Sequence, residues 1–177
     1  MKLLIPTSSG LEQTVKRQLF KLGYEKAPAF NGRIEVDGDW SDVAKLNIRL
    51  RSGERVLIKL AEFEAKTFDE LFDGVYAIDW ENWLKMDSQI LMDGKSVQSA
   101  LGAIKVTGGV AKKAIIRRLS DKLKTSKNSR VTFTETGARS IVGISIFKDM
   151  VTVTLDTSGD GLHKRGYRAI GNDAPLH

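Results

Sequence analysis

The sequence predicts an α+β fold, because strand-like and helix-like segments follow one another along the chain and the order of the first six is characteristic. Up to Phe63 that order is strand, helix, strand, strand, helix, strand, which is the ferredoxin-like βαββαβ arrangement. Hydrophobic residues make up 41% of the 177 residues, enough for a packed core. We therefore expect a ferredoxin-like domain over residues 1–64, an α/β domain over residues 65–160 and a linker over residues 161–177.

Local chemistry supports each element of the first domain. Ser9-Gly10-Leu11-Glu12 has the spacing of a capping box, which starts a helix, and Asn31-Gly32 is a strong signal for a β-hairpin turn. Pro28 weakens the strand that contains it and places that strand at a sheet edge. Asp39 predicts the cap of a second helix, whose inner side carries Trp40, Val43, Leu46 and Leu50. The predicted strands cover residues 3–5, 24–30, 33–37 and 55–63.

The second domain is predicted to contain two main helices and several strands. Thr67-Phe68-Asp69-Glu70 is a capping box ahead of a helix with apolar residues at i, i+3, i+4 and i+7. Trp80 and Trp83 lie in an acidic stretch, so we expect them to pack in the core or between domains rather than to stack on bases. Lys148-Asp149 is a candidate tight turn between two alternating segments, which predicts a β-hairpin. The predicted strands cover residues 89–92, 130–134, 140–148 and 151–155.

A basic amphipathic helix from Val110 to about Thr125 is the centre of the second domain. Gly108 and Gly109 come just before its expected first turn, so we expect free backbone N–H groups there to favour an anion. A polyanion would also find the basic side of the helix. The alternative is a core helix with an ordinary solvated basic face. Its apolar face carries Ala111, Ala114, Ile115, Leu119 and Leu123.

The charge of the chain is unevenly distributed. The formal net charge is +6. Residues 65–95 hold 3 Lys and Arg against 7 Asp and Glu, whereas residues 96–177 hold 14 against 6. An acidic partner is therefore expected to bind the C-terminal half.

The composition argues against several functional classes. The chain has no cysteine, which excludes disulfides, thiolate catalysis and thiolate metal sites and fits a cytoplasmic protein. Its two histidines, His163 and His177, are too few for a metal cluster, so we expect no metal. No apolar stretch approaches the length of a transmembrane helix and no signal peptide opens the chain, so we expect no membrane association.

A small phosphate-handling enzyme on the ferredoxin-like domain is an alternative from another class. Ser8, Ser9 and Gly10 offer a loop after the first strand, but the loop has no Arg and the chain shows no nucleophile and base at a suitable spacing. We therefore prefer a capped helix start there. Asp156 and Asp160 are likewise interpreted as turn residues rather than as an acid/base pair or a calcium loop.

A family resemblance comes from Gly161-Leu162-His163-Lys164-Arg165-Gly166-Tyr167-Arg168, which is followed by Ala174-Pro175-Leu176. Together with Ser99-Ala100-Leu101, Ala103-Ile104-Lys105 and Ala114-Ile115, this segment resembles the bacterial THUMP-containing class I ribosomal RNA methyltransferases of the large-subunit guanine-N2 type, often labelled N6-adenine-specific DNA methylases. The resemblance covers the whole chain in order: a ferredoxin-like domain, a THUMP domain over residues 65–160, and a linker toward a methyltransferase domain.

This resemblance implies a function and partners. It implies the RNA-binding, substrate-recognition portion of an S-adenosylmethionine-dependent 23S rRNA guanine-N2 methyltransferase. The implied partners are large-subunit ribosomal RNA and the C-terminal methyltransferase domain of the same polypeptide. In the family that domain holds the target base with an Asn-Pro-Pro-Tyr type motif, which this chain does not contain. We therefore expect no catalytic residue and no cofactor in this chain, with S-adenosylmethionine bound elsewhere in the full-length protein.

Basic residues are the candidates for RNA contacts, because duplex RNA is recognised mainly through phosphates and 2′-OH groups. Arg165 could instead pair with an Asp in domain packing, and Tyr167 is expected to pack between domains. Two interpretations stay open beside ribosomal RNA: a stand-alone THUMP RNA-binding adaptor, and the THUMP portion of a tRNA-modifying enzyme. The candidates are Lys105, Lys112, Lys113, Arg117, Arg118 and Arg139, with a second cluster of Lys164, Arg165 and Arg168.

Overall fold

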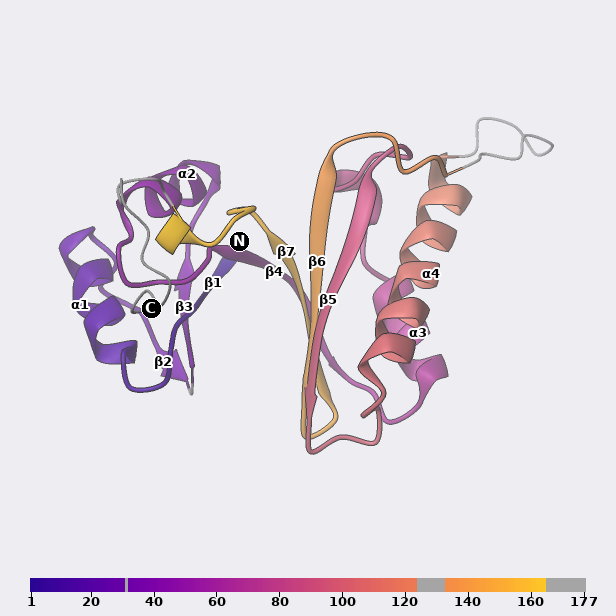
Figure 1. Cartoon of the computed structure of the whole chain (residues 1–177), viewed down its shortest axis with the longest axis horizontal. Coiled ribbons are helices and arrows are strands. Elements are labelled where there is room, and N and C mark those ends of the chain that lie inside the picture. The colour runs from indigo at the N-terminus through magenta and orange to yellow at the C-terminus, as the bar shows by residue number, and fades with distance from the viewer. Residues whose placement is uncertain (31, 124–132, 165–177) are drawn as a thin grey trace, which may run out of the picture. The chain divides into compact units, whose positions relative to one another are not determined.

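The computed structural model of the chain describes residues 1–30, 32–123 and 133–164, which form two compact units (Figure 1). The first unit consists of Met1–Ile58 and the described residues from Asp156, and the second unit consists of Lys59–Leu155. The chain therefore leaves the first unit within β4 (Leu57–Glu64) and returns to it at the end of β7 (Met150–Asp156). This return precedes residue 161, where we expected the linker to begin.

The first unit contains a small sheet with the strand order β2-β3-β1, followed by the start of β4. The pairs β1/β3 and β2/β3 are antiparallel, with Leu4 opposite Glu35 in the first of them. The elements follow the predicted order, so the ferredoxin-like fold class is confirmed. They are β1 (Lys2–Pro6), α1 (Glu12–Lys21), β2 (Ala29–Phe30), β3 (Arg33–Asp37), α2 (Trp40–Arg49) and the short 3-10 helix η2 (Leu162–Lys164).

The hairpin at residues 31–32 is confirmed, because Phe30 pairs with Arg33 across it. Gly32 has a φ of +72°, a left-handed conformation that glycine adopts without steric cost. The strand before the turn is much shorter than the predicted 24–30, since β2 covers only Ala29–Phe30. Pro28 lies outside the strand, although its carbonyl accepts the N–H of Glu35 at 3.0 Å.

The predicted cap of α2 is confirmed, whereas the predicted capping box of α1 is wrong. Asp39 accepts hydrogen bonds from the backbone N–H groups of Ser41 and Asp42 at 2.8 and 3.1 Å. Helix α1 begins at Glu12, behind an N-cap residue, Leu11, that makes no side-chain capping bond. The carboxylate of Glu12 binds N–H groups of the neighbouring loops instead of Ser9.

Trp40 does not face the core, so its predicted place on the inner side of α2 is wrong. Its side chain is 62% exposed, whereas Val43, Leu46 and Leu50 are buried as predicted. Trp40 is the first residue of the helix, and positions 43, 46 and 50 fill the inner side without it. Spacing alone could not separate these two outcomes.

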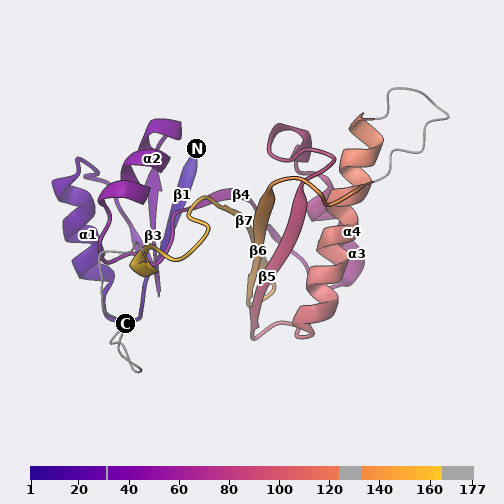
Figure 2. The ribbon, with the colours of Figure 1, turned by 45° about the horizontal axis from the view of Figure 1, so that its top comes forward.

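The second unit is a sheet covered on one face by two helices. Helix α4 connects the parallel strands β5 and β6, and β6 and β7 form the predicted antiparallel hairpin, so its strand order is β4-β7-β6-β5. Figures 1 and 2 both show α3 and α4 side by side on the same face of the sheet. Besides β4 and β7, its elements are α3 (Phe68–Tyr76), η1 (Trp80–Asn82), β5 (Gln89–Val97), α4 (Ile104–Leu123) and β6 (Arg139–Phe147).

The core of the second unit lies between this sheet and the two helices. Trp80 is fully buried in it, and its indole N–H donates to the carbonyl of Val75 at 2.7 Å, so the prediction that Trp80 packs in the core is confirmed. The Thr67 capping box is also confirmed, because the Thr67 hydroxyl accepts from Glu70 N at 3.2 Å and the Glu70 carboxylate accepts from Thr67 N. Of the predicted strand 130–134, residues 130–132 lie outside the described part, and residues 133 and 134 form no strand.

Candidate nucleic-acid interface

Helix geometry divides the residues of α4 into a core face and a solvent face. The core face confirms the predicted apolar side, apart from Leu123, whose side chain lies outside the described part of the chain. Lys105, Lys113 and Arg117 are exposed on the other side. Small and apolar residues make up the core face: Thr107, Ala111, Ala114, Ile115 and Leu119.

The anion site expected at Gly108 and Gly109 is wrong. Helix α4 begins at Ile104 rather than at Val110, so both glycines lie inside the helix and their N–H groups belong to its hydrogen-bond ladder. The Thr107 hydroxyl supports the earlier start, because it donates to the carbonyl of Ala103 at 3.1 Å. The free N–H groups of the helix therefore lie in the turn that begins at Ile104.

The first turn of α4 is basic, in contrast to those of the other α-helices that the structure describes. Helices α1, α2 and α3 each have an acidic residue in the first turn, whereas α4 has none and carries Lys105 there. A cation at a helix N-terminus costs about 0.3–1 kcal/mol, because it meets the positive end of the helix dipole. The position of Lys105 is therefore one that the fold alone disfavours and that a bound anion would favour.

Arg118 belongs to an ion-pair network inside the second unit. Its guanidinium donates to Glu81 through Nε at 3.1 Å and through Nη2 at 2.9 Å, and it also contacts Asp79. The hydrogen bonds between Arg118 and Glu81 raise the pKa of the arginine and lower the pKa of the carboxyl group. The Arg118 side chain is only 12% exposed, so it holds α4 against η1 and we leave it out of the exposed basic surface.

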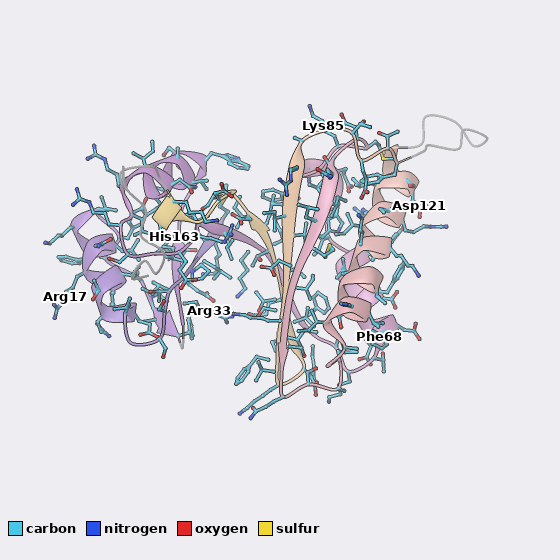
Figure 3. All side chains as sticks on the ribbon, viewed as in Figure 1. Arg17, Arg33, Phe68, Lys85, Asp121 and His163 are labelled. Carbon is cyan, nitrogen blue, oxygen red and sulfur yellow. The ribbon has the colours of Figure 1, made fainter. Side chains whose placement is uncertain are left out.

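Arg117 and Lys112 also have carboxylate partners, but they differ in exposure. Arg117 Nε lies 2.8 Å from Asp121 Oδ2, and its side chain is 66% exposed. Asp121 is labelled in Figure 3, where it projects from the outer part of α4. Lys112 pairs with Glu135 and is about one third exposed. Asp121 is only 25% exposed and also accepts the Tyr76 hydroxyl at 3.2 Å, so it keeps a partner if Arg117 turns to an RNA phosphate.

The remaining candidates do not form one group with α4 in the described structure. Arg139 is exposed at the start of β6, in the second unit. Lys164 is exposed at the end of η2 and belongs to the first unit. Arg165 and Arg168 lie outside the described residues, so the second predicted cluster is represented only by Lys164. Among these candidates, the exposed cations that one element brings together are therefore Lys105, Lys113 and Arg117, and Lys122 is also exposed on the same helix.

A carboxylate occupies the loop between β1 and α1, which contradicts a phosphate site there. Glu12 Oε2 accepts the N–H of Gly10 at 2.8 Å, and Oε1 accepts the N–H of Gly32 at 3.0 Å. Backbone hydrogen bonds, first its own and then that of Gly32, hold the pKa of Glu12 below its ordinary value, so the group is charged at neutral pH. The Glu12 carboxylate already occupies the N–H groups of Gly10 and Gly32, and its negative charge would repel a phosphate. The phosphate-handling alternative is therefore wrong.

No catalytic or metal-binding constellation accompanies the basic surface in the described residues. No group of three or more His, Asp or Glu side chains there is placed to hold a metal ion, and no described helix is long and apolar enough to cross a membrane. An open groove of about 880 Å³ lies in the first unit between α2 and residues 157–164. Its polar groups Asn47, Thr157 and Ser158 form hydrogen bonds with one another, so they join α2 to the following segment and are not directed at a ligand.

Sequence analysis missed one aromatic residue with neighbouring lysines. Phe147 is 55% exposed at the end of β6, and the ammonium group of Lys148 lies 5.5 Å from its ring centroid. Lys95 is exposed on the neighbouring strand β5. We treated Lys148 only as a turn residue, although the alternation of β5 and β6 is a signal that Lys95 and Phe147 share a face.

The domains match two family models. Residues 2–57 match the RlmL ferredoxin-like domain, and residues 65–156 match the THUMP domain. The chain is 38% identical to "Putative RNA methyltransferase YpsC" of Bacillus subtilis (strain 168), over 98% of this chain and 44% of that protein. It is 29% identical to "Ribosomal RNA large subunit methyltransferase K/L" of Psychromonas ingrahamii, over 99% of this chain and 23% of that protein. The chain thus spans less than half the length of these curated relatives.

Comparison with solved structures agrees with these matches. A "predicted N6-adenine-specific DNA methylase" from Listeria monocytogenes superposes with a TM-score of 0.90 at 42% identity, over 99% of this chain and 45% of that one. "SMU.472, a putative methyltransferase complexed with SAH" superposes with a TM-score of 0.85 at 37% identity, over 94% of this chain and 44% of that one. TrmN from Thermus thermophilus shares only the fold, at 15% identity and a TM-score of 0.68.

Proposed function

Because this chain belongs to the THUMP domain family and carries an RlmL-type ferredoxin-like domain ahead of it, we propose that it is the RNA-recognition portion of an S-adenosylmethionine-dependent methyltransferase acting on large-subunit ribosomal RNA. The names of the two curated relatives support an RNA substrate, and one of them supports the large ribosomal subunit. The family resemblance adds the exocyclic amine of a guanine as the methylated group. The partner in cis is then a methyltransferase domain in the remaining length that the relatives have.

The exposed basic side of α4 is the observation that carries this proposal. Lys105, Lys113 and Arg117 are exposed on a single helix, and Lys105 lies in the first turn, where the helix dipole disfavours a cation and a bound anion would offset that cost. We assign these three residues to RNA phosphates. Lys112, Arg139 and Lys164 are secondary candidates, because Lys112 is paired and the other two lie on other elements.

The cofactor is proposed to bind outside the described residues. S-adenosylmethionine sites on Rossmann-like sheets have a glycine-rich turn after a parallel strand. Here the connection after the parallel strand β5 is Gln98 to Ala103, which has one glycine. The loop after β1 is filled by the Glu12 carboxylate. The structure with SAH belongs to a relative more than twice as long, which supports a cofactor site in the further domain.

A binding experiment across a salt series tests the proposal. The full 177-residue chain is titrated into a fluorescent ribosomal RNA stem-loop and into a DNA duplex of the same length. If three phosphates are contacted, the log–log salt slope lies between about −2 for single-stranded and about −3 for paired nucleic acid, which is roughly a 20- to 40-fold loss of affinity between about 50 and 200 mM salt. The variant Lys105→Glu/Lys113→Glu/Arg117→Glu is expected to lose RNA binding. The matched control Lys16→Glu/Arg17→Glu/Lys21→Glu reverses three exposed charges on α1 and is expected to retain it.

Three results would count against the proposal. Equal binding to RNA and DNA would contradict RNA as the substrate class. Equal loss in both triple variants would show a non-specific charge effect rather than a surface on α4. Absence of RNA binding at low salt would mean that these domains only position the methyltransferase domain.

A further inference from the structure

The sheet of the second unit ends in a row of three exposed apolar side chains. The strand register places Val97 beside Phe147 and Phe147 beside Met150, so the three side chains lie on the same face. They are 52%, 55% and 43% exposed. Single exposed apolar residues are common, whereas a contiguous group of large ones is a candidate binding surface. We refer to Val97, Phe147 and Met150 as the Phe147 row.

The Phe147 row lies on the face of the sheet that the helices leave open. Ile146 and Val151, the neighbours that point the opposite way, are fully buried in the core beneath α3 and α4. The next residues on the same face as the row are Lys95 and Ser145, which pair with each other. Lys95 is exposed and Ser145 half-buried, so this part of the face combines an aromatic ring, a small polar group and a cation.

The turn beside Phe147 has a defined backbone conformation. Lys148 and Asp149 have φ angles of +50° and +62°, a region that residues other than glycine rarely adopt. The Lys148 N–H donates to the carbonyl of Val97 at 3.2 Å, and the Asp149 carbonyl accepts the N–H of Ala65 at 2.9 Å. Phe147 pairs with Met150 across these two residues, and a two-residue hairpin of type I′ needs a positive φ at both of them, so the hairpin itself sets this conformation.

The side chain of Asp149 further fixes the turn. One carboxylate oxygen accepts the N–H of Ala100 at 3.0 Å. The Ser99 hydroxyl, followed by the Ala100 N–H, holds the pKa of Asp149 below its ordinary value. The carboxylate is thus bonded to its own loops, and the ammonium group of Lys148 is the charge that lies next to the Phe147 ring. A ring and a cation held in this way lose little entropy on binding a ligand.

We propose that the Phe147 row, with Lys95 and Lys148 beside it, binds unpaired bases of the RNA whose paired region contacts α4. This inference rests on the proposed function and adds a second, chemically different surface to it. An aromatic ring on an open sheet face stacks on a base of any sequence, and lysines beside it contact the flanking phosphates. The basic side of α4 has no exposed aromatic residue among its described positions and suits paired RNA, so the two surfaces recognise a stem with unpaired nucleotides.

A comparison of two RNA stems tests this inference. One stem is fully paired, and the other has the same sequence with a bulge of unpaired adenines. The wild-type chain is expected to bind the bulged stem more tightly. Phe147→Ala is expected to remove that preference, a loss of about 5- to 150-fold on the bulged stem alone, as for one stacked base. Phe147→Trp is expected to keep it, and Phe20→Ala, which removes a ring from α1 that is 65% exposed, is expected to behave as the wild type.

The outcomes separate this inference from the proposed function. Binding of the paired stem with no preference for the bulge overturns the stacking surface and leaves the function on α4 intact. A bulge preference that survives Phe147→Ala also overturns it. Failure to bind either stem overturns both proposals. A dimer in light scattering that Phe147→Ala converts to a monomer without any change in RNA binding would assign the row to contacts between copies of the chain.

Discussion

Arg118 and Glu81 form a two-point ion pair that joins α4 to η1 across 37 residues of sequence. Both nitrogen atoms of the contact, Nε and Nη2, come from the edge of the guanidinium that matches the two carboxylate oxygens. Arg117, the preceding residue, points outward to solvent. Two adjacent arginines on one helix therefore differ: Arg118 is held in an internal ion pair, whereas Arg117 is exposed and is the one that we propose for RNA contacts.

Exchanging these arginines for alanine one at a time separates stability from binding. Arg118→Ala leaves the carboxylates of Glu81 and Asp79 without their cation, so we expect a lower melting temperature and little change in RNA affinity. Arg117→Ala removes only an exposed pair, so we expect an unchanged melting temperature and weaker RNA binding. Differential scanning fluorimetry and RNA titration of both variants check this. The opposite assignment of the two effects would refute it.

Lys105→Glu is expected to stabilise the protein while it weakens RNA binding. A glutamate in the first turn meets the positive end of the helix dipole, so the free energy of unfolding should rise by about 0.3–1 kcal/mol. Lys113→Glu is the control, because Lys113 lies in the middle of α4, where the dipole effect is small. Urea denaturation of both variants measures the difference. A loss of stability in Lys105→Glu would contradict the account of the first turn.

Two glycine-to-alanine substitutions in helices are expected to act in opposite directions. Alanine is favoured over glycine in a helix interior by about 1 kcal/mol. At Gly109 a Cβ meets no atom within 4 Å, so Gly109→Ala should stabilise the protein by about this amount. At Gly74 a Cβ would lie 2.2 Å from Cε2 of Phe63, so Gly74→Ala should destabilise it, by about 1–3 kcal/mol from overpacking. Thermal melts of both variants decide the signs.

The depressed pKa of Glu12 predicts a contribution to stability that acid removes. Backbone N–H groups favour its charged form in the folded state, so its stabilising effect is complete above about pH 4.5, the ordinary value, and is lost as the pH falls through the lower folded pKa. Glu12→Gln should be less stable than the wild type at pH 7 and should lose less stability between pH 5 and 3. Parallel pH profiles in both proteins would expose this account as mistaken.

Local chemistry predicted those parts of the fold that depend on neighbouring residues. The hairpin at residues 31–32, the cap at Asp39 and the capping box at Thr67 are all confirmed, because each is made within a few residues. The predicted start of α4 at Val110 was wrong, because Gly108-Gly109 resembles a helix boundary. A tertiary contact favours the earlier helix start at Ile104. Gly94 on β5 leaves room for the Ile104 side chain, since a Cβ added at Gly94 would lie only 3.1 Å from Ile104 Cγ2.

The candidate interface was predictable in part. The sequence marks Lys105, Lys113 and Arg117 as basic positions opposite an apolar face, and the structure places all three in solvent. It does not distinguish Arg118 from them, since the partners Asp79 and Glu81 lie in another element. The exposure of Phe147 was also beyond the sequence, because it depends on where the sheet ends relative to the helices that cover its other face.

The pair of Arg55 with Asp156 bridges 101 residues, and the second unit lies entirely between them in the sequence. A ribosome adds about 5–20 residues per second, so Asp156 emerges roughly 5–20 seconds after Arg55. Strand β7 (Met150–Asp156) pairs with β6 in the second unit and ends at Asp156, so the last strand of the second unit and the returning segment of the first emerge almost together. Met1–Ile58 therefore cannot complete the ion pair of Arg55 until the whole second unit has been synthesised.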